Sequence, residues 1–374
     1  MAPPRSRPRI VAVTPGDPMD YRTQSGVARR FVDALAEEVP VVARIDASMT
    51  NTQRAFAATI NFHPLRDHWR RNMHASVTAA RLCTQNLRRG VWKAPAGFDL
   101  VLHIRGSYTE IEFPFVSYID NTSHLALQHW PGLVGSSRRR IELGSRREQR
   151  ALGRAEHIFV TGHLVKRSLV DQYGIPEQRV TVVGGGVNFE PLPILAQELR
   201  PPVILFIGMD FARKGGYELL EAFRFVRQHI ATATLRIAGA APQISEPGVE
   251  TLGIIRDRAA LSGIYSGARV FCHPARYEPY GMVVLEAMAH GLPVVTTDVG
   301  AMDEILDGGR AGVLVPPSDP LRLRQALLEL LGDDGTKAAR IGAKARERVE
   351  RELTWPRVVD RMVPALERLG RRAL

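Results

Sequence analysis

The second half of the chain alternates short apolar runs with longer segments whose apolar residues recur every three to four positions. Apolar runs of roughly four to eight residues predict buried strands, and the longer periodic segments predict helices. Regular alternation of the two predicts a parallel sheet with helices on both faces. The predicted strands are 203–210, 234–240, 249–255, 268–274, 293–298 and 311–316, and the clearest helices are 217–229 and 321–332.

The first half shows the same alternation less cleanly. Residues 25–39 predict a helix, for which Ser25 is a suitable N-cap. Residues 50–95 are polar, rich in arginine and poorly periodic, so they predict helices and loops whose order the pattern does not give. The predicted strands are 9–16, 39–46, 98–106, 113–120, the end of 135–162, and 180–188.

Prolines mark a join between the two halves. PLP at 191–193 and PP at 201–202 bracket a segment that is typical of an interdomain linker. A chain of 374 residues is long enough for two domains. We therefore expect one Rossmann-like domain at 1–195 and a second at 196–350, followed by a C-terminal helix at 351–374.

Residues 268–300 combine a strand, a loop broken by Pro279 and Gly281, a helix and a second strand. A strand that enters a helix N-terminus through such a loop presents free backbone N–H groups to an anion. Glu278 in the loop and Glu286 on the helix frame this site. Carboxylates are poor phosphate ligands, so we expect them to hold hydroxyl groups, such as those on both sides of the phosphates in a sugar nucleotide. A generic βα unit with two solvated glutamates is the alternative.

A second anion-binding arrangement is predicted at 208–216, after the first strand of the second half. Gly208 opens this glycine-containing loop, and Arg213 and Lys214 come just before the helix that follows. Glycines and cationic side chains at a helix start suit a phosphate group. The spacing is not that of a Walker loop. Two surface basic residues near a helix start are the alternative.

The stretch that contains the two glutamates resembles the donor-site signature of the retaining GT-B glycosyltransferases of glycosyltransferase family 4, the group 1 glycosyltransferases. The resemblance rests on the pair Glu278 and Glu286, the intervening PYGMVVL, and EAMAHGLPVVTTDVGAMDEIL behind it. It extends more weakly over nearly the whole chain. Thr354 and Trp355, followed by a helix, resemble the start of the family's last helix, which implies that the segment 351–374 crosses back onto the first domain.

The resemblance implies an α/β GT-B fold, with two Rossmann-like parallel-sheet domains facing a central cleft. It implies transfer of a hexose-type sugar from a nucleoside-diphosphate sugar to an acceptor hydroxyl, with retention of anomeric configuration. Glu278 would contact the transferred sugar, and Glu286 the ribose hydroxyls. The donor-binding residues that it implies are Gly208, Arg213, Lys214, Ile255, Tyr280, Gly281, Met282, Val283 and Glu286.

The 208–216 loop departs from the family pattern in one position. Family members usually have an arginine right after the first glycine and a lysine before Gly215. Met209 occupies the first position here, whereas Lys214 matches the second. Arg213 can supply the missing positive charge.

Asp120 is the predicted catalytic partner of Glu278. It ends the run 113–120, and residues at the carboxyl ends of parallel strands line the ligand site of α/β folds. Many family members carry a histidine there, so the aspartate puts any histidine-based role in doubt. His124 and His129 could substitute, although a solvated or packed helix histidine is the reading that we favour.

Ser25 and Gly26 are the predicted acceptor-side and sugar-side residues. A glycine at a βα turn lets a ligand approach the backbone closely. In the family a glycine-containing loop here faces the sugar and the acceptor. Many members carry two glycines at this point, whereas this chain has Gly26 alone. An ordinary helix cap is the alternative.

The chain is strongly basic, with a net charge of +11. Such a charge favours anionic partners. Arginines gather in the first half as Arg70–Arg71, Arg88–Arg89, Arg138–Arg140 and Arg146–Arg147. We expect them to meet an anionic or lipid-linked acceptor or a membrane surface, with a solvated arginine-rich surface as the alternative. No zinc-finger, RNA-recognition or basic-zipper pattern occurs, so we expect no nucleic acid partner.

The remaining composition limits location and redox chemistry. No run of 18 apolar residues occurs, and the basic start leads into a short strand rather than a signal sequence. We expect a cytoplasmic protein, with peripheral contact at the inner face of the membrane as an option. Cys83 and Cys272 are too few for a disulfide framework, so each is expected to be a buried thiol.

We expect no cofactor and no metal ion. No DxD element stands at a strand end, and Arg213, Lys214 and a helix dipole can neutralise a leaving diphosphate. Two alternatives stay open: a non-catalytic sugar-nucleotide-binding relative, and a sugar-nucleotide epimerase on the same fold. A dinucleotide dehydrogenase is disfavoured because no GxGxxG follows a strand.

Overall fold

A computed structural model gives the fold of this chain. It divides into two compact units, the first made of Met1–Gly184 with Trp355–Leu374 and the second of Gly185–Thr354. The division falls at Gly184, so the proline-rich segment 191–202 belongs to the second unit. The residues that the structure describes are 7–20, 23–66, 69, 73, 76–106, 111–130, 138–195, 200–332 and 334–370.

The first unit is built on a six-stranded parallel sheet with the order β2-β1-β3-β4-β5-β6. β1, β3 and β4 are buried along their whole length, as expected for apolar strands covered on both faces. The strands are β1 (Ile10–Thr14), β2 (Val41–Asp46), β3 (Leu100–Ile104), β4 (Phe115–Ile119), β5 (His157–Val160) and β6 (Val180–Val182).

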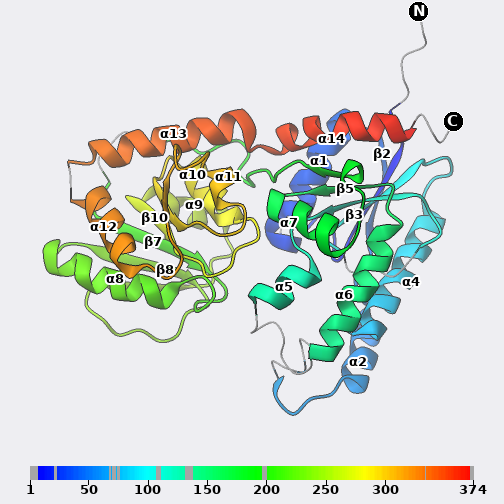
Figure 1. Cartoon of the computed structure of the whole chain (residues 1–374), viewed down its shortest axis with the longest axis horizontal. Coiled ribbons are helices and arrows are strands. Elements are labelled where there is room, and N and C mark those ends of the chain that lie inside the picture. The colour runs from blue at the N-terminus through cyan, green and yellow to red at the C-terminus, as the bar shows by residue number, and fades with distance from the viewer. Residues whose placement is uncertain are drawn as a thin grey trace, which may run out of the picture. The chain divides into compact units, whose positions relative to one another are not determined.

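Helices of both ends of the chain cover this sheet. The C-terminal helix α14 belongs to the first unit and packs on α1 (Figure 1). Its first residue, Trp355, is buried with its ring centroid 5.4 Å from that of Phe31 and 6.3 Å from that of Tyr118. The described helices of this unit are α1 (Val27–Glu38), α2 (Asn51–Ile60), α4 (Val77–Lys93), α5 (Ser123–His129), α6 (Arg138–Gly153), α7 (His163–Arg167) and α14 (Trp355–Gly370), with short turns η1 (Thr23–Gly26), η3 (Ser168–Gln172) and η4 (Glu177–Arg179).

The expected N-cap of α1 is wrong. Residues 23–26 form the 3-10 turn η1, and the N-cap is Gly26, which gives no side-chain cap hydrogen bond. Its φ of 85° is a left-handed conformation that glycine adopts without strain. The tight turn therefore replaces Ser25 as the start of the helix.

The second unit is built on another six-stranded parallel sheet, with the order β12-β11-β10-β7-β8-β9. The alternation of apolar runs and helical segments predicted it, and the structure confirms each of the six strands. They are β7 (Val203–Gly208), β8 (Thr234–Gly239), β9 (Val249–Gly253), β10 (Val270–His273), β11 (Val294–Thr297) and β12 (Val313–Val315).

Helices cover both faces of this second sheet. α13 lies along α10 on one face, and α8 and α12 lie on the other (Figure 1). Each face has its own apolar cluster, one with Leu285 and Val349 and the other with Phe223 and Leu327. The described helices are α8 (Gly216–His229), α9 (Arg258–Ser266), α10 (Met282–Ala289), α11 (Met302–Ile305), α12 (Pro320–Leu331) and α13 (Thr336–Glu352).

Each unit carries one cysteine, and both are free thiols. Cys83 lies on α4 and is partly exposed, whereas Cys272 lies in β10 and is fully buried. Within the described part of the chain, no helix is both long and apolar enough to cross a membrane.

Candidate functional site

The donor-side residues gather where the strand order of the second sheet reverses. β7 is followed in one direction by β8 and β9, whereas its other neighbour is β10. In open α/β sheets, ligands bind at such a switch point, beyond the carboxyl ends of the strands. The loop that follows β7 carries Arg213 and Lys214, and the loop that follows β10 carries Glu278.

The two loops are joined by a backbone–backbone hydrogen bond and by another from a side chain to the backbone. Arg276 N–H donates to the Arg213 carbonyl at 2.9 Å, and Arg213 Nη1 donates to the Tyr277 carbonyl at 2.7 Å. Gly215 has a φ of 78°, and a Cβ there would lie 1.9 Å from the Pro274 carbonyl oxygen. Only a glycine allows this approach, so the loops form one rigid platform.

Lys214 projects from the first loop onto the second. Its aliphatic stem packs on Gly208, where an added Cβ would lie 3.1 Å from Lys214 Cγ. Its ammonium group pairs with Glu278 Oε2, and both side chains are mostly buried. Burial, and then the charge of Arg213, lower the pKa of Lys214 to about 7. Lys214, the residue predicted to bind the phosphate, is therefore in direct contact with Glu278, the residue predicted to bind the sugar.

Backbone packing sets the position of Glu278. Gly300, which follows β11, has a φ of 62°, and a Cβ there would lie 1.7 Å from the Glu278 carbonyl oxygen. Gly281, the N-cap of α10, has a φ of 96° and faces the Met302 methyl group. Two glycines in left-handed conformations thus shape the loop.

His273 also contacts Glu278, although the sequence pattern did not single it out. It is the last residue of β10, and its Nε2 lies 3.2 Å from Glu278 Oε2. Burial, followed by the charges of Lys214 and Arg213, holds its pKa well below the usual range, so the imidazole is neutral. Its place five residues before Glu278 at a strand end was the available signal.

Glu286 lies inside α10 and is bonded to protein groups on both carboxylate oxygens. Arg258 Nη1 contacts Oε1 at 3.2 Å, and the Tyr265 hydroxyl donates to Oε2 at 3.1 Å. Burial raises the pKa of Glu286, and the nearby Arg258 opposes that effect. Arg258 and Tyr265 both come from α9, and the sequence analysis missed them. Ile255 lies half-buried in the loop that leads into this helix.

The remaining donor-side residues lie at the start of α10. Tyr280 is buried, and its hydroxyl accepts from Gly185 N–H at 2.6 Å and donates to the Gly185 carbonyl at 2.9 Å. Met282 and Val283 are the first two residues of the helix, where backbone N–H groups lack an intrahelical acceptor. The structure thus brings the residues of this set to one edge of the second sheet.

The predicted residues of the first unit lie at the carboxyl edge of its own sheet. Asp120 follows β4, and its Oδ2 pairs with Arg105 Nη2, which follows β3, at 3.0 Å. Arg105 has a φ of 50°, a strained conformation for a residue other than glycine. Gly26 begins α1, and the Ser25 side chain lies outside the described part of the structure.

Other polar residues of the first unit have different surroundings. His103 in β3 is buried, with its ring centroid 4.5 Å from that of Phe115, and burial lowers its pKa to about 3. It is therefore a core residue. His129 is exposed at the end of α5, and His124 is half-buried there. Arg70, Arg71 and the side chains of Arg138–Arg140 lie outside the described residues.

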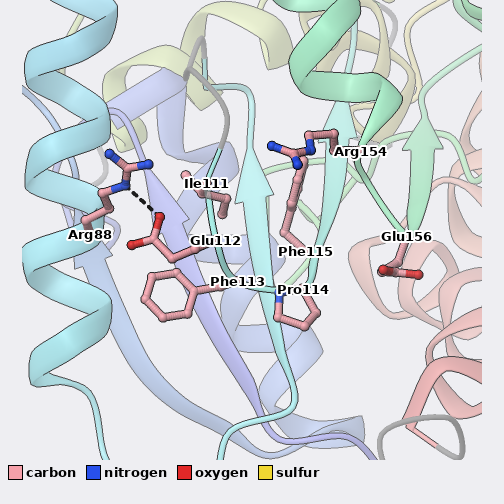
Figure 2. A pocket seen from close by; sticks show the side chains of 8 residues that line it. All are labelled: Arg88, Ile111, Glu112, Phe113, Pro114, Phe115, Arg154 and Glu156. Carbon is pink, nitrogen blue, oxygen red and sulfur yellow. Dashed lines mark hydrogen bonds and ion pairs between the residues drawn. The ribbon is translucent and has the colours of Figure 1, made fainter.

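A pocket of about 480 Å³ lies at the opposite edge of the first sheet. Figure 2 shows Arg88 of α4 bonded to Glu112 on one side, and Arg154 and Glu156 on the other. Phe115 and Glu156 mark the beginning of β4 and β5, so this pocket is remote from Asp120 at the end of β4. Among the described residues, no group of three His, Cys, Asp or Glu side chains could hold a metal ion.

Comparison with known proteins finds a family match within the second unit. Residues 201–333 match the family described as glycosyl transferases group 1. A glycogen synthase of Mycobacterium tuberculosis is 29% identical over 203 residues, which are 51% of this chain and 49% of the relative. A D-inositol 3-phosphate glycosyltransferase of Thermobispora bispora is 30% identical over 261 residues, 59% of this chain and 60% of the relative. The aligned part therefore spans about half to three fifths of these relatives.

Solved structures extend the likeness to both units. A sucrose-phosphate synthase from Thermosynechococcus elongatus has a TM-score of 0.69 at 19% identity, with 97% of this chain and 100% of that chain covered. An Anabaena protein, HepE, solved in complex with UDP-glucose, has a TM-score of 0.56 at 17% identity, with 72% and 78% covered. The two parallel sheets and these neighbours establish the GT-B fold. Within the second unit, residues 201–333 thus match the group 1 glycosyltransferase family.

Proposed function

We propose that this protein transfers a hexose-type sugar from a nucleoside-diphosphate sugar to an acceptor hydroxyl, with retention of anomeric configuration. The observation that carries the proposal is the platform at the β7–β10 switch point, where Lys214, Glu278 and the start of α10 meet. It offers cationic and backbone N–H donors for a diphosphate beside a carboxylate that can accept from sugar hydroxyls. The UDP-glucose in the Anabaena neighbour supports a donor of this class.

Each side chain of the platform has a distinct role in this proposal. Lys214, Arg213 and the first N–H groups of α10 stabilise the diphosphate as negative charge develops on it. Glu286 accepts hydrogen bonds from the ribose, and Glu278 positions the transferred sugar. Asp120, at the edge of the first unit, acts on the acceptor side with Gly26.

The chemical step needs no covalent enzyme intermediate. The bond between the anomeric carbon and the leaving phosphate oxygen breaks, and the acceptor oxygen forms its bond on the same face of the sugar. The acceptor proton passes to the leaving phosphate oxygen. Because protein cations can neutralise the diphosphate, we propose that transfer does not require a metal ion. Turnover that EDTA abolishes and Mg²⁺ or Mn²⁺ restores would contradict this proposal.

A panel of nucleotide sugars tests the activity. UDP-glucose, ADP-glucose and GDP-mannose are titrated into the protein, and the donor that binds is supplied with candidate acceptors. We expect release of a nucleoside diphosphate and a product whose anomeric proton coupling in NMR matches that of the donor. Inverted configuration would contradict retention. An altered sugar nucleotide with no transfer would favour an epimerase, and binding with no turnover would favour a non-catalytic relative.

We propose further that the acceptor is anionic or lipid-linked and reached at a membrane surface. α2 and α4 contain no acidic residue, and they carry Arg54, Arg81 and Lys93. Large apolar side chains are exposed in and just after α2 as well, including Phe56 and Phe62, which are 56% and 69% exposed. Apolar side chains among cations suit the interface of an anionic bilayer. This location would be cytoplasmic and peripheral.

Liposome flotation tests the membrane contact. We expect binding to vesicles that contain anionic lipid, less binding to neutral vesicles, and a decrease as salt rises, because such contacts are screened over about 8 Å at physiological ionic strength. Phe56→Ser should weaken flotation, whereas Tyr217→Ser, at an exposed aromatic residue of the second unit, should not. Equal binding to neutral and anionic vesicles would leave a small soluble acceptor as the better proposal.

A further inference from the structure

Two residues with separate roles in the proposed function are bonded to each other. Lys214 is assigned to the diphosphate and Glu278 to the sugar, yet the Lys214 ammonium group pairs with Glu278 Oε2. Both are mostly buried, with 13% and 9% of their side chains exposed. Buried charges are stable when paired, so the contact belongs to the nucleotide-free protein. The inference that follows rests on the proposed function and deepens it.

A diphosphate that reaches this platform must compete with Glu278 for Lys214. The carboxylate already accepts from the ammonium group, and a phosphate oxygen offers the same charge-assisted bond. When Lys214 turns to the phosphate, Glu278 loses its cation while it remains buried. An ionised carboxylate that loses a buried partner is costly unless another donor holds it.

His273 is placed to be that donor. Its Nε2 lies 3.2 Å from Glu278 Oε2, the same oxygen that Lys214 contacts. A carboxylate only accepts hydrogen bonds, and a neutral imidazole carries one N–H group. The proton is therefore on Nε2, and Nδ1 carries the lone pair. Within the described part of the chain, Nδ1 is buried and has no hydrogen-bond partner.

Packing fixes the imidazole without the help of Nδ1. The ring lies nearly parallel to those of Phe271 and Phe206, at centroid distances of 6.1 and 6.5 Å. The Thr296 hydroxyl donates to the His273 carbonyl at 2.7 Å. A buried acceptor without a partner costs free energy that an apolar residue would avoid. The contact with Glu278 is the feature that an apolar residue could not supply.

We propose that Lys214 and His273 share Glu278 in the nucleotide-free protein, that a nucleoside diphosphate draws Lys214 away, and that His273 then alone keeps Glu278 oriented toward the sugar. His273 is a positioning residue, since it is buried and acts through Glu278. In this arrangement Glu278 weakens the binding of a free nucleoside diphosphate, because it competes for Lys214.

Calorimetric titration of UDP into the unchanged protein, two single variants, their double variant and a control tests the competition. Glu278→Gln should bind UDP about three- to tenfold more tightly than the unchanged protein, because the uncharged amide is a weaker partner for an ammonium group. In a Lys214→Gln background the same substitution should give no gain, since the contested group is gone. Glu246→Gln, at the Arg224 ion pair of the same unit, is the matched control and should leave UDP affinity unchanged.

A second pair of variants tests His273. His273→Leu should bind UDP several-fold more weakly, because release of Lys214 then leaves Glu278 without a donor. His273→Gln carries an N–H group near the position of Nε2 and should recover most of the affinity. In the Glu278→Gln background, His273→Leu should have little effect. A purely structural role would weaken binding equally in both backgrounds.

The outcomes separate this inference from the proposed function. If the unchanged protein binds none of UDP, ADP and GDP, the proposed function is wrong and the inference with it. If UDP binds but Glu278→Gln binds it equally or more weakly, the competition is refuted while the function stands. If the loss in His273→Leu persists in the Glu278→Gln background, the positioning role is refuted. Melting temperatures confirm folding of each variant, and Glu278→Ala replaces Glu278→Gln if the latter does not fold.

Discussion

The carboxyl edges of the two sheets hold their charged residues in different ways. In the second unit, Glu278 and Glu286 are buried, Lys214 is mostly buried, and all three are bonded to protein groups. In the first unit, Asp120 makes one ion pair with Arg105 and keeps 34% of its side chain exposed. The residues matched to the group 1 glycosyltransferases all lie in the second unit. A common donor chemistry can use one preformed platform, whereas an edge with fewer internal bonds can be adapted to different acceptors.

The largest expected effect concerns the glycines that shape the platform. Gly300 and Gly308 have nearly equal φ values, 62° and 63°, but only at Gly300 would an added Cβ meet backbone, 1.7 Å from the Glu278 carbonyl oxygen. Gly300→Ala should lower the free energy of unfolding by about 3 kcal/mol, the sum of strain and overpacking. Gly308→Ala should cost about 1 kcal/mol from strain alone. Urea unfolding measures both. Equal losses would show that the loop can yield and that the platform is not rigid.

Glu286 should give the next largest effect. Charge-assisted hydrogen bonds contribute about 1.5–3 kcal/mol each, so Glu286→Gln should weaken UDP binding roughly 10- to 100-fold. Glu278→Gln is expected to change the same affinity in the opposite direction. Glu250→Gln removes the carboxylate of an exposed ion pair with Arg236 and serves as the control. Retained UDP affinity in Glu286→Gln, measured by calorimetry, would place the ribose elsewhere.

A fall in pH should lower the free energy of unfolding of the first unit, because His103 is buried in its neutral form. Its folded pKa of about 3 lies below the unfolded value of about 6.5, so the unfolded chain binds the extra proton. Its contribution to stability is complete above pH 6.5 and is lost as pH falls toward 3, by about 1.4 kcal/mol per pH unit. His103→Phe should reduce the slope of unfolding free energy between pH 6 and 4.5, and His129→Gln, at an exposed position, should not. An unchanged slope in His103→Phe would show that His103 is not buried neutral.

Substitution of Asp120 should have the smallest effect on the free energy of unfolding and on UDP affinity. Asp120→Asn removes a partly exposed ion pair, worth less than about 1 kcal/mol. UDP affinity should stay within about twofold, because Asp120 lies on the other unit, whereas the transfer rate should fall. Calorimetry and a transfer assay on the same preparation compare the two. A loss of UDP affinity as large as that in Glu286→Gln would remove the distinction between the two edges.

Local patterns in the sequence predicted most of the fold and part of the platform. Parallel strands buried on both faces read as continuous apolar runs, so all six strands of the second unit could be found. Glycines and prolines mark the ends of the loops and of the helix that carry Lys214, Glu278 and Glu286. The spacing of these residues was therefore enough to single them out. The N-cap of α1 was missed. Ser25 is a suitable N-cap by residue type, but the chain forms a tight turn there, and Gly26 adopts the left-handed conformation that the turn requires.

The partners of those residues could not be predicted in the same way. Tyr265 and Arg258 reach Glu286 from a different helix, 21 and 28 residues away in the chain. His273 is near in sequence, but its neutral state depends on burial between aromatic rings, which no spacing reveals. Pairing across elements is a property of packing, and periodicity does not report it.

The positions of the two cysteines allow local unfolding of the second sheet to be measured by thiol alkylation. A thiol reacts with an alkylating reagent only as an exposed thiolate. Burial raises the pKa of both thiols, but Cys83 is partly exposed on α4 and should be modified first. The pKa of Cys272 lies far above its usual range, and this thiol is fully buried in β10. Modification of Cys272 under native conditions would therefore record how often β10, the strand that contains both Cys272 and His273, unfolds locally. Saturating UDP should stabilise the folded second sheet and so slow the modification of Cys272. It should leave the rate of modification of Cys83 unchanged.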